Sequence, residues 1–149
     1  QKLLEEQPDW HGPIKDKNCT GCHQPHSSDL FRLLKYNYPK SFYSEFEIDK
    51  YDLCNQCHFA TNIVNKESPL LTNFRDGNKN LHFLHVNKKK GRTCRACHET
   101  HASIKPFHIR EEVPFGKWML PVNFSPNETG GSCAPGCHVE KTYSRDKVE

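Results

Sequence analysis

Four pairs of cysteines, each followed at once by histidine, constrain this chain more than any other feature of its sequence. Two residues separate the cysteines in the first three pairs, and three residues separate them in the last. Any fold must therefore accommodate the same local chemistry at four places along the chain. The motifs are Cys19–His23, Cys54–His58, Cys94–His98 and Cys133–His138.

This spacing is the attachment signature of c-type haem. Two thiols add to the two vinyl groups on one edge of the porphyrin, and the histidine places a nitrogen ligand on the iron. In the last motif Pro135 and Gly136 suit a bulge that absorbs the extra residue. We therefore predict four haem c groups attached through Cys19, Cys22, Cys54, Cys57, Cys94, Cys97, Cys133 and Cys137. The predicted proximal ligands are His23, His58, His98 and His138.

Zinc and disulfide bonds are the alternatives for eight cysteines. Neither requires histidine directly after the second cysteine of a pair. Histidine is 10 of 149 residues, so four such placements by chance are improbable. A zinc module would be colourless, which separates it from a haem protein by eye.

The composition agrees with a cofactor that supplies the core. Only 34% of residues are hydrophobic and the mean hydropathy is −0.86, against roughly 45–50% apolar residues in ordinary domains. Such a chain has few apolar side chains to offset the entropy of folding. No apolar run approaches the ~20 residues of a membrane span, and the start at Gln1 is typical of a processed protein or a fragment.

The charge excludes an obvious nucleic-acid surface. The net charge is +3, from 21 basic and 18 acidic residues. Basic residues cluster only over 88–92, which we interpret as a solvated turn rather than a binding face. We therefore expect redox proteins, not nucleic acids, as partners.

Six other histidines and one methionine, Met119, are available as second ligands. Four irons then favour bis-histidine coordination. The predicted distal ligands are His11, His26, His85 and His101. Two histidines, His82 and His108, are left over; each could bind iron or stand at the surface, and we keep His82 among the candidate ligands.

Chain length limits which iron each histidine can reach. The Cα atoms of two histidines on one iron lie about 13 Å apart, given bonds of about 2 Å, whereas three extended residues span at most ~11 Å. His26 therefore cannot share an iron with His23, nor His101 with His98. His82 and His85 cannot share one either, so such segments tie neighbouring haems together.

The spacing also reveals an internal duplication. His11, Cys19, His23 and His26 recur 74 or 75 residues later, as His85, Cys94, His98 and His101. We predict one tetrahaem domain over 1–149, with repeats at about 11–70 and 82–143.

Regular structure is expected to be sparse, with a few short α-helices wrapped around four closely packed haems. The clearest predicted helix covers about 50–64, capped by Asp49. Short turns are expected at 94–98 and at 29–35, the latter capped by Ser28. Turns are expected at Asp76–Gly77 and at Gly130–Gly131. Four prolines predict an irregular connection over 103–132, and the tail from Glu140 can fray or dock.

These motifs resemble the doubled-CXXCH multihaem cytochromes. The resembling segments are CTGCHQPH at 19–26, LCNQCH at 53–58, FRDGNKNLHFLHV at 74–86, GRTCRACHETH at 91–101 and GGSCAPGCH at 130–138. The resemblance implies exported proteins of respiratory or extracellular electron transport, with stacked haems and little regular structure. Some such proteins are soluble carriers, and others polymerise into filaments.

The resulting expectation is an electron-transfer protein without enzymatic activity, periplasmic or extracellular. A filament subunit whose haems contact its neighbours and a soluble tetrahaem shuttle both fit the sequence. The alternative from a different functional class is a multihaem reductase, which would need an iron with an open coordination position. Ten histidines outnumber the irons' needs and leave that rival without support.

Overall fold

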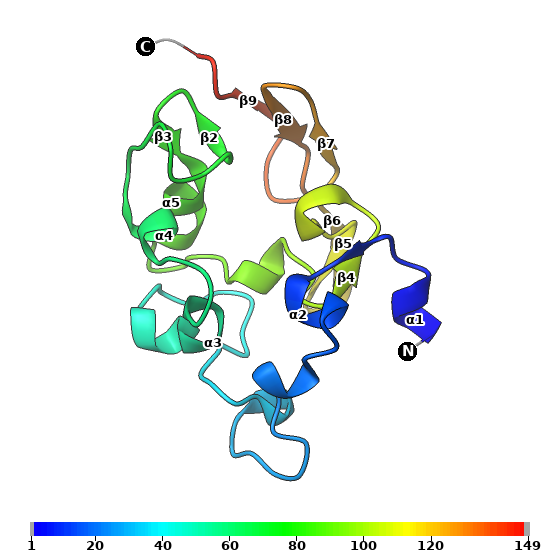
Figure 1. The fold of residues 1–149 in the computed structure, drawn as a ribbon. Coiled ribbons are helices and arrows are strands. Elements are labelled where there is room, and N and C mark those ends of the chain that lie inside the picture. Colours follow the sequence, from blue (N-terminus) through cyan, green and yellow to red (C-terminus); the bar gives the residue numbers. More distant parts are fainter. Residues whose placement is uncertain (1, 148–149) are drawn as a thin grey trace.

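A computed structural model describes residues 2–147 of the chain, which folds into many short elements joined by irregular segments (Figure 1). The α-helices are α1 (Lys2–Glu5), α2 (Gly12–Lys15), α3 (Asp52–Asn55), α4 (Thr61–Val64) and α5 (Leu81–Val86). The 3₁₀ turns are η1 (Cys19–Gly21), η2 (Phe31–Leu33), η3 (Ile48–Tyr51), η4 (Cys94–Ala96) and η5 (Pro106–His108). The strands are β1 (Asp9–Trp10), β2 (Arg75–Asp76), β3 (Lys79–Asn80), β4 (Ala102–Ser103), β5 (Glu112–Phe115), β6 (Trp118–Pro121), β7 (Phe124–Pro126), β8 (Gly130–Cys133) and β9 (Lys141–Ser144).

The strands form small antiparallel sheets rather than one large one. Strands β2 and β3 form one hairpin, β5 and β6 form another, and β7, β8 and β9 form a three-stranded sheet in that order. Strand β1 pairs with β4, and the amide of His11 donates to the carbonyl of His101 over 2.9 Å. This last pairing joins the N-terminal segment to the second half of the chain.

The predicted irregular connection over 103–132 is wrong in its second part. Residues 112–121 form the β5–β6 hairpin, and Gly130–Gly131, predicted as a turn, begins strand β8. Prolines are tolerated in these strands because each has an edge on which no ladder donor is needed. Strand β9 pairs with β8, so the C-terminal tail docks, and the side chain of Lys147 contacts Asp76 at 2.8 Å.

The predicted helix over 50–64 is also wrong as a single element. It is divided into η3, α3 and α4, and the chain leaves helical geometry between residues 55 and 61. Asp49 lies inside η3 rather than at its cap, which is Glu47. The second cysteine motif begins in α3 and ends beyond it.

Two smaller predictions are confirmed in outline. A turn with Gly77 at a φ of 55° joins β2 to β3, and 3₁₀ turns lie within 29–35 and 94–98. Ser28 does not cap its turn as a helix cap would; its hydroxyl accepts from the amide of Leu30 and donates to the carbonyl of Leu34.

The apolar core of the polypeptide is small and divided. One buried cluster consists of Leu34, Tyr38 and Tyr51, and the other of Val113, Val122 and Phe124. Attachment cysteines border both clusters: Cys54 and Cys94 pack against the first, and Cys133 packs against the second. The buried apolar side chains are therefore concentrated beside the cysteine motifs. Among residues 2–147, no helix is long and apolar enough to cross a membrane.

Helix α5 is held by a fully buried asparagine. The Asn80 side-chain oxygen accepts from the amides of His82 and Phe83, which caps the helix. Its amide group donates to the carbonyls of Asn62 and Asn65 over 2.9 and 2.8 Å. Helix α5 carries His82 and His85, so this one side chain sets the position of two candidate ligands against α4.

We predict that Asn80→Ala lowers the free energy of unfolding by about 2–3 kcal/mol, because it removes buried hydrogen bonds and leaves their backbone partners unsatisfied. Denaturant unfolding of the holoprotein measures the change. Asn78→Ala is the matched control, since Asn78 is exposed in the same hairpin, and it should stay within about 0.5 kcal/mol of the parent. Equal losses in both variants would contradict the role of Asn80.

Candidate functional site

The first and third cysteine motifs have the same local structure. Each begins in a 3₁₀ turn, η1 or η4, in which the histidine amide donates to the carbonyl of the first cysteine. Farther along, the amides of Lys35 and Arg110 donate to the carbonyls of Cys22 and Cys97 over 2.8 and 2.9 Å. The duplication seen in the sequence therefore extends to about residues 19–35 and 94–110.

The proximal rings of these two motifs are anchored in the same way. His23 Nδ1 donates to the carbonyl of Arg32 over 3.1 Å, and His98 Nδ1 donates to the carbonyl of Phe107 over 3.0 Å. A carbonyl can only accept, so the proton lies on Nδ1 and Nε2 is left free. A ring held through Nδ1 presents Nε2 as the metal ligand.

The second and fourth motifs are built differently. Cys54 lies in α3, and the amides of Cys57 and His58 donate back to its carbonyl. Cys133 ends strand β8, and the three-residue spacer curls against the end of β6, where the Gly136 amide donates to the carbonyl of Pro121. A Cβ atom on Gly136 would lie 2.9 Å from Leu120 Cδ2, so the close approach favours glycine.

Three pairs of histidine rings face each other across the structure. The ring centroids of His11 and His58 lie 6.1 Å apart, with planes 7° apart. For His23 and His101 the values are 6.0 Å and 29°. For His82 and His98 they are 6.4 Å and 24°. Each pair contains one predicted proximal histidine and one ring from a distant segment.

These separations fit an iron between each pair of rings. A metal–nitrogen bond of about 2 Å plus about 1.1 Å from nitrogen to ring centre, taken twice, gives about 6.2 Å. Two rings in direct contact with each other would have no space for an ion at bonding distance. The donor set also suits haem, because the porphyrin supplies four nitrogens and leaves only two positions for protein.

The fourth proximal histidine lies near His85. Burial lowers the pKa of His85, and the charges of Arg92 and His138 contribute to the same shift, so His138 lies within electrostatic range of His85. The Nδ1 atom of each ring meets a backbone carbonyl, that of Leu81 at 2.7 Å for His85 and that of Val139 at 2.6 Å for His138. His82 and His85 thus turn from one short helix toward different partners, as the chain-length argument requires.

Burial disfavours the protonated form of several candidate ligands. It lowers the pKa of His82 to about 4, with a further contribution from His98, and it also lowers the pKa of His98 and His101. Only neutral imidazole binds a metal, so a lowered pKa removes competition from protons. The His82 ring is oriented by Thr72, whose hydroxyl lies 3.0 Å from Nδ1.

Two histidines take no part in these pairs. His26, predicted as a distal ligand, is exposed, and among residues 2–147 no other histidine ring faces it. His108 lies beside a candidate ligand instead: its ring is edge-on to His11 at 5.4 Å, and its Nδ1 is 3.4 Å from an Asp9 carboxylate oxygen.

The thiols of successive motifs are neighbours. Burial raises the pKa of Cys22, and the nearby Cys57 thiol adds to the rise. The neighbouring Cys94 thiol raises the pKa of Cys54, with burial adding to it. Burial raises the pKa of Cys97 to about 11, with Cys133 contributing. As thioethers these sulfurs would not titrate, so the shifts matter here only because they show which thiols lie within electrostatic range of one another.

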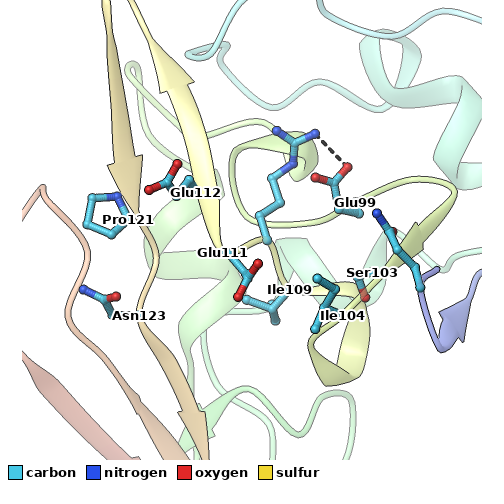
Figure 2. Close-up of a pocket in the computed structure, with 10 residues that line it drawn as sticks. Glu99, Ser103, Ile104, Ile109, Glu111, Glu112, Pro121 and Asn123 are labelled. Atoms are coloured by element: carbon cyan, nitrogen blue, oxygen red, sulfur yellow. Dashed lines mark hydrogen bonds and ion pairs between the residues drawn. The ribbon is translucent and has the colours of Figure 1, made fainter. Parts of the chain in front are cut away.

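One pocket of the polypeptide is not part of this arrangement. It has a volume of about 480 Å³, and its lining includes Ser103 at the end of β4, the segment 109–112 and Pro121 at the end of β6 (Figure 2). Its lining includes Glu99, paired with Arg110 at 2.9 Å, and the carboxylates of Glu111 and Glu112, but neither cysteine nor histidine. Arg110 also donates to the carbonyl of His98 over 3.2 Å, so this wall braces the third motif.

Several positioning groups were not predicted from the sequence. They are the carbonyls of Arg32 and Phe107, the Thr72 hydroxyl and the Asn80 side chain. Asn80 could have been found, because an asparagine directly before a short apolar run is a common helix cap. The two carbonyls carry no side-chain signal.

Comparison with protein families matches residues 11–63 to the family described as doubled CXXCH motif. This match covers the first two cysteine motifs and His11. No curated protein and no solved structure matches the chain. The CXXCH motifs indicate covalent binding of haem c.

We predict that Gly136→Val destabilises the fourth motif by about 1–3 kcal/mol through overpacking against Leu120. Mass spectrometry of peptides that contain Cys133 and Cys137 should show reduced haem occupancy there and full occupancy elsewhere. Gly136→Ala is the graded control, because the one close atom is a Leu120 methyl that can rotate away. Full occupancy in the valine variant would contradict this account of the spacer.

Proposed function

We propose that the chain binds four haem c groups, each iron held between two histidines, and that it transfers electrons along them. The observation that carries the proposal is the set of facing imidazoles, whose centroids lie 6.0–6.4 Å apart. Three pairs at the spacing expected for an intervening iron, each including the histidine of a CXXCH motif, have no simpler common cause.

The proposed ligand sets follow from these pairs. The first site takes His23 and His101, and the second takes His58 and His11. The third takes His98 and His82, and the fourth takes His138 and His85. Every iron then has two nitrogen ligands within one chain, and neither His26 nor His108 is needed.

Haem c supplies an iron that accepts or gives up one electron without further bond chemistry. The polypeptide's part is to hold neutral imidazoles in place and to keep successive sites close. With haem bound, one site would be oxidised as its neighbour is reduced, so transfer would need no proton or group to move.

Adjacent sulfurs support a linear order of sites. Cys22 neighbours Cys57, Cys54 neighbours Cys94, and Cys97 neighbours Cys133. Each contact joins one motif to the next in chain order. The proposed route therefore runs from the first site to the fourth, with the Leu34–Tyr38–Tyr51 cluster packed around the central junction.

The geometry favours this proposal over a zinc module and over a reductase. A structural zinc site needs four convergent ligands, and in the described part of the chain no group of three or more metal-binding side chains converges. A reductase needs an iron with an open position, whereas each proximal histidine here has a distal ring available. We therefore propose no enzymatic reaction.

The proposal extends to location and partners. Haem attachment of this kind points to an exported protein, periplasmic or at the cell surface, that exchanges electrons with redox proteins. A filament subunit and a soluble shuttle both satisfy the site. Electron microscopy of the purified protein distinguishes them, because only the first gives continuous fibres.

The haem count is tested by the mass of the intact, denatured protein. We expect the polypeptide plus four haem masses, because thioether bonds survive denaturation. Cys137→Ala should reduce the attachment at the fourth motif alone. Three or fewer haems in the parent protein would refute the assignment of Cys133–His138.

The ligand assignment is tested by a matched pair of histidine variants. His26 and His101 each follow a CXXCH histidine by three residues, but only His101 faces a proximal ring. His101→Ala should open one iron, so the reduced protein should bind about one equivalent of carbon monoxide. His26→Ala should bind none, like the parent; the reverse result would overturn the assignment.

A further inference from the structure

Two pairs of consecutive residues adopt left-handed backbone conformations at equivalent places. Arg32 and Leu33 have φ values of 57° and 56°, and Phe107 and His108 have values of 60° and 56°. Each pair lies nine and ten residues after the histidine of its motif, His23 or His98. None of the four is glycine or asparagine, so each conformation is strained.

Local packing does not explain this strain. Leu33 and Phe107 are 44% and 63% exposed, and Arg32 is exposed as well. The two segments share little sequence, Phe31-Arg32-Leu33 against Pro106-Phe107-His108. The two segments share their backbone conformation, so a common role must depend on that conformation.

The left-handed pair turns the chain so that two successive carbonyls face the motif. The carbonyl of Arg32 accepts from His23 Nδ1, and that of Leu33 accepts from the amide of Gln24 over 2.8 Å. In the third motif the carbonyl of Phe107 accepts from His98 Nδ1, and that of His108 accepts from the amide of Glu99 over 2.7 Å. An ordinary extended or helical pair would direct these carbonyls elsewhere.

We infer that the pairs Arg32–Leu33 and Phe107–His108 are positioning devices that fix the proximal imidazoles of the first and third sites and thereby set the electron affinity of those two sites. The inference rests on the proposed function, since it concerns histidines that bind iron. It goes further by assigning a role to residues that are neither ligands nor attachment points.

The physical link is the basicity of the imidazole. A ring that donates its Nδ1 proton to a carbonyl is a more basic ligand through Nε2. A more basic ligand favours ferric over ferrous iron, which lowers the reduction potential. Loss of the left-handed turn should therefore raise the potential of the affected site and leave the others unchanged.

Three variants separate this role from general destabilisation. Leu33→Val places a β-branched residue where φ is 56°, which that residue strongly disfavours. Leu33→Gly keeps the conformation without strain. Leu70→Val makes the same chemical change as the first variant at a leucine that is 89% exposed and not left-handed.

The readouts are spectroelectrochemical titration of the loaded protein and nitrogen-15 NMR of labelled histidine in the reduced state. We expect Leu33→Val to raise one of the four potentials, a tenfold loss of ferric preference being about 59 mV for one electron. The same variant should lose the protected Nδ1 proton of His23. Leu33→Gly and Leu70→Val should retain both parent properties.

Unchanged potentials and a still-protected proton in Leu33→Val would overturn the inference, as would an equal shift in Leu70→Val. If Leu33→Val does not accumulate with its haems, Phe107→Val replaces it, because it places a β-branched residue at a φ of 60° in the equivalent pair of the third site, and the same two outcomes decide with His98 in place of His23. A parent protein without haem would instead refute the proposed function, so the two failures are distinguishable.

Discussion

The facing imidazoles are the constraint on which the rest of this structure depends. They join residues 11 and 58, 23 and 101, and 82 and 98, so segments far apart in the chain are held together at single points. Among the residues that the structure describes, buried apolar side chains form two small clusters of three residues each. Iron–histidine bonds and thioethers would therefore supply much of the free energy that an apolar core supplies elsewhere, as structural metals do in small domains. The β1–β4 pairing also brings distant segments together, because it places His11 beside the segment that carries His101.

Much of the irregular structure holds the proposed ligands in position. A distal helix of six residues, α5, is too short to be stable by itself, so its position comes from Asn80 and from contact with α4. In the proposed ligand sets the two histidines on that helix serve different irons, so α5 would connect the third and fourth sites. The anchoring carbonyls near the first and third motifs come from 3₁₀ turns.

The local chemistry was predictable from the sequence, and the long-range partners were only partly so. The four motifs are visible because attachment depends on adjacent residues. The number and spacing of the histidines predicted His11, His85 and His101 as distal ligands, and each lies near a predicted proximal histidine. The sequence could not distinguish His26 from His82 as a ligand, because that choice depends on which segments meet in space. The strands beyond residue 112 were missed because Pro114, Pro121 and Pro126 were interpreted as residues that interrupt regular structure. Edge positions in small sheets tolerate proline. The helix over 50–64 was overextended because no proline or glycine in that segment marks where the chain leaves helical geometry after residue 55.

The two halves of the chain keep the same local units but differ in how those units exchange ligands. His11 and His85 occupy matching positions, and each is paired in the proposed ligand sets with the histidine of the second motif in its own half of the chain, His58 or His138. The histidines that follow the first and third motifs differ between the halves. The ring of His101 lies opposite His23 of the first motif. His26 has no equivalent partner, because His82 lies opposite His98 of the third motif. A local unit survives divergence because its hydrogen bonds depend on a backbone path that different side chains can follow, as Arg32–Leu33 and Phe107–His108 do. A distal ligand depends instead on where a second segment lies, so a single new histidine such as His82 can replace it. The first and third motifs therefore share their attachment sequence and anchoring turn, whereas the second ligand differs between the two halves in the proposed ligand sets.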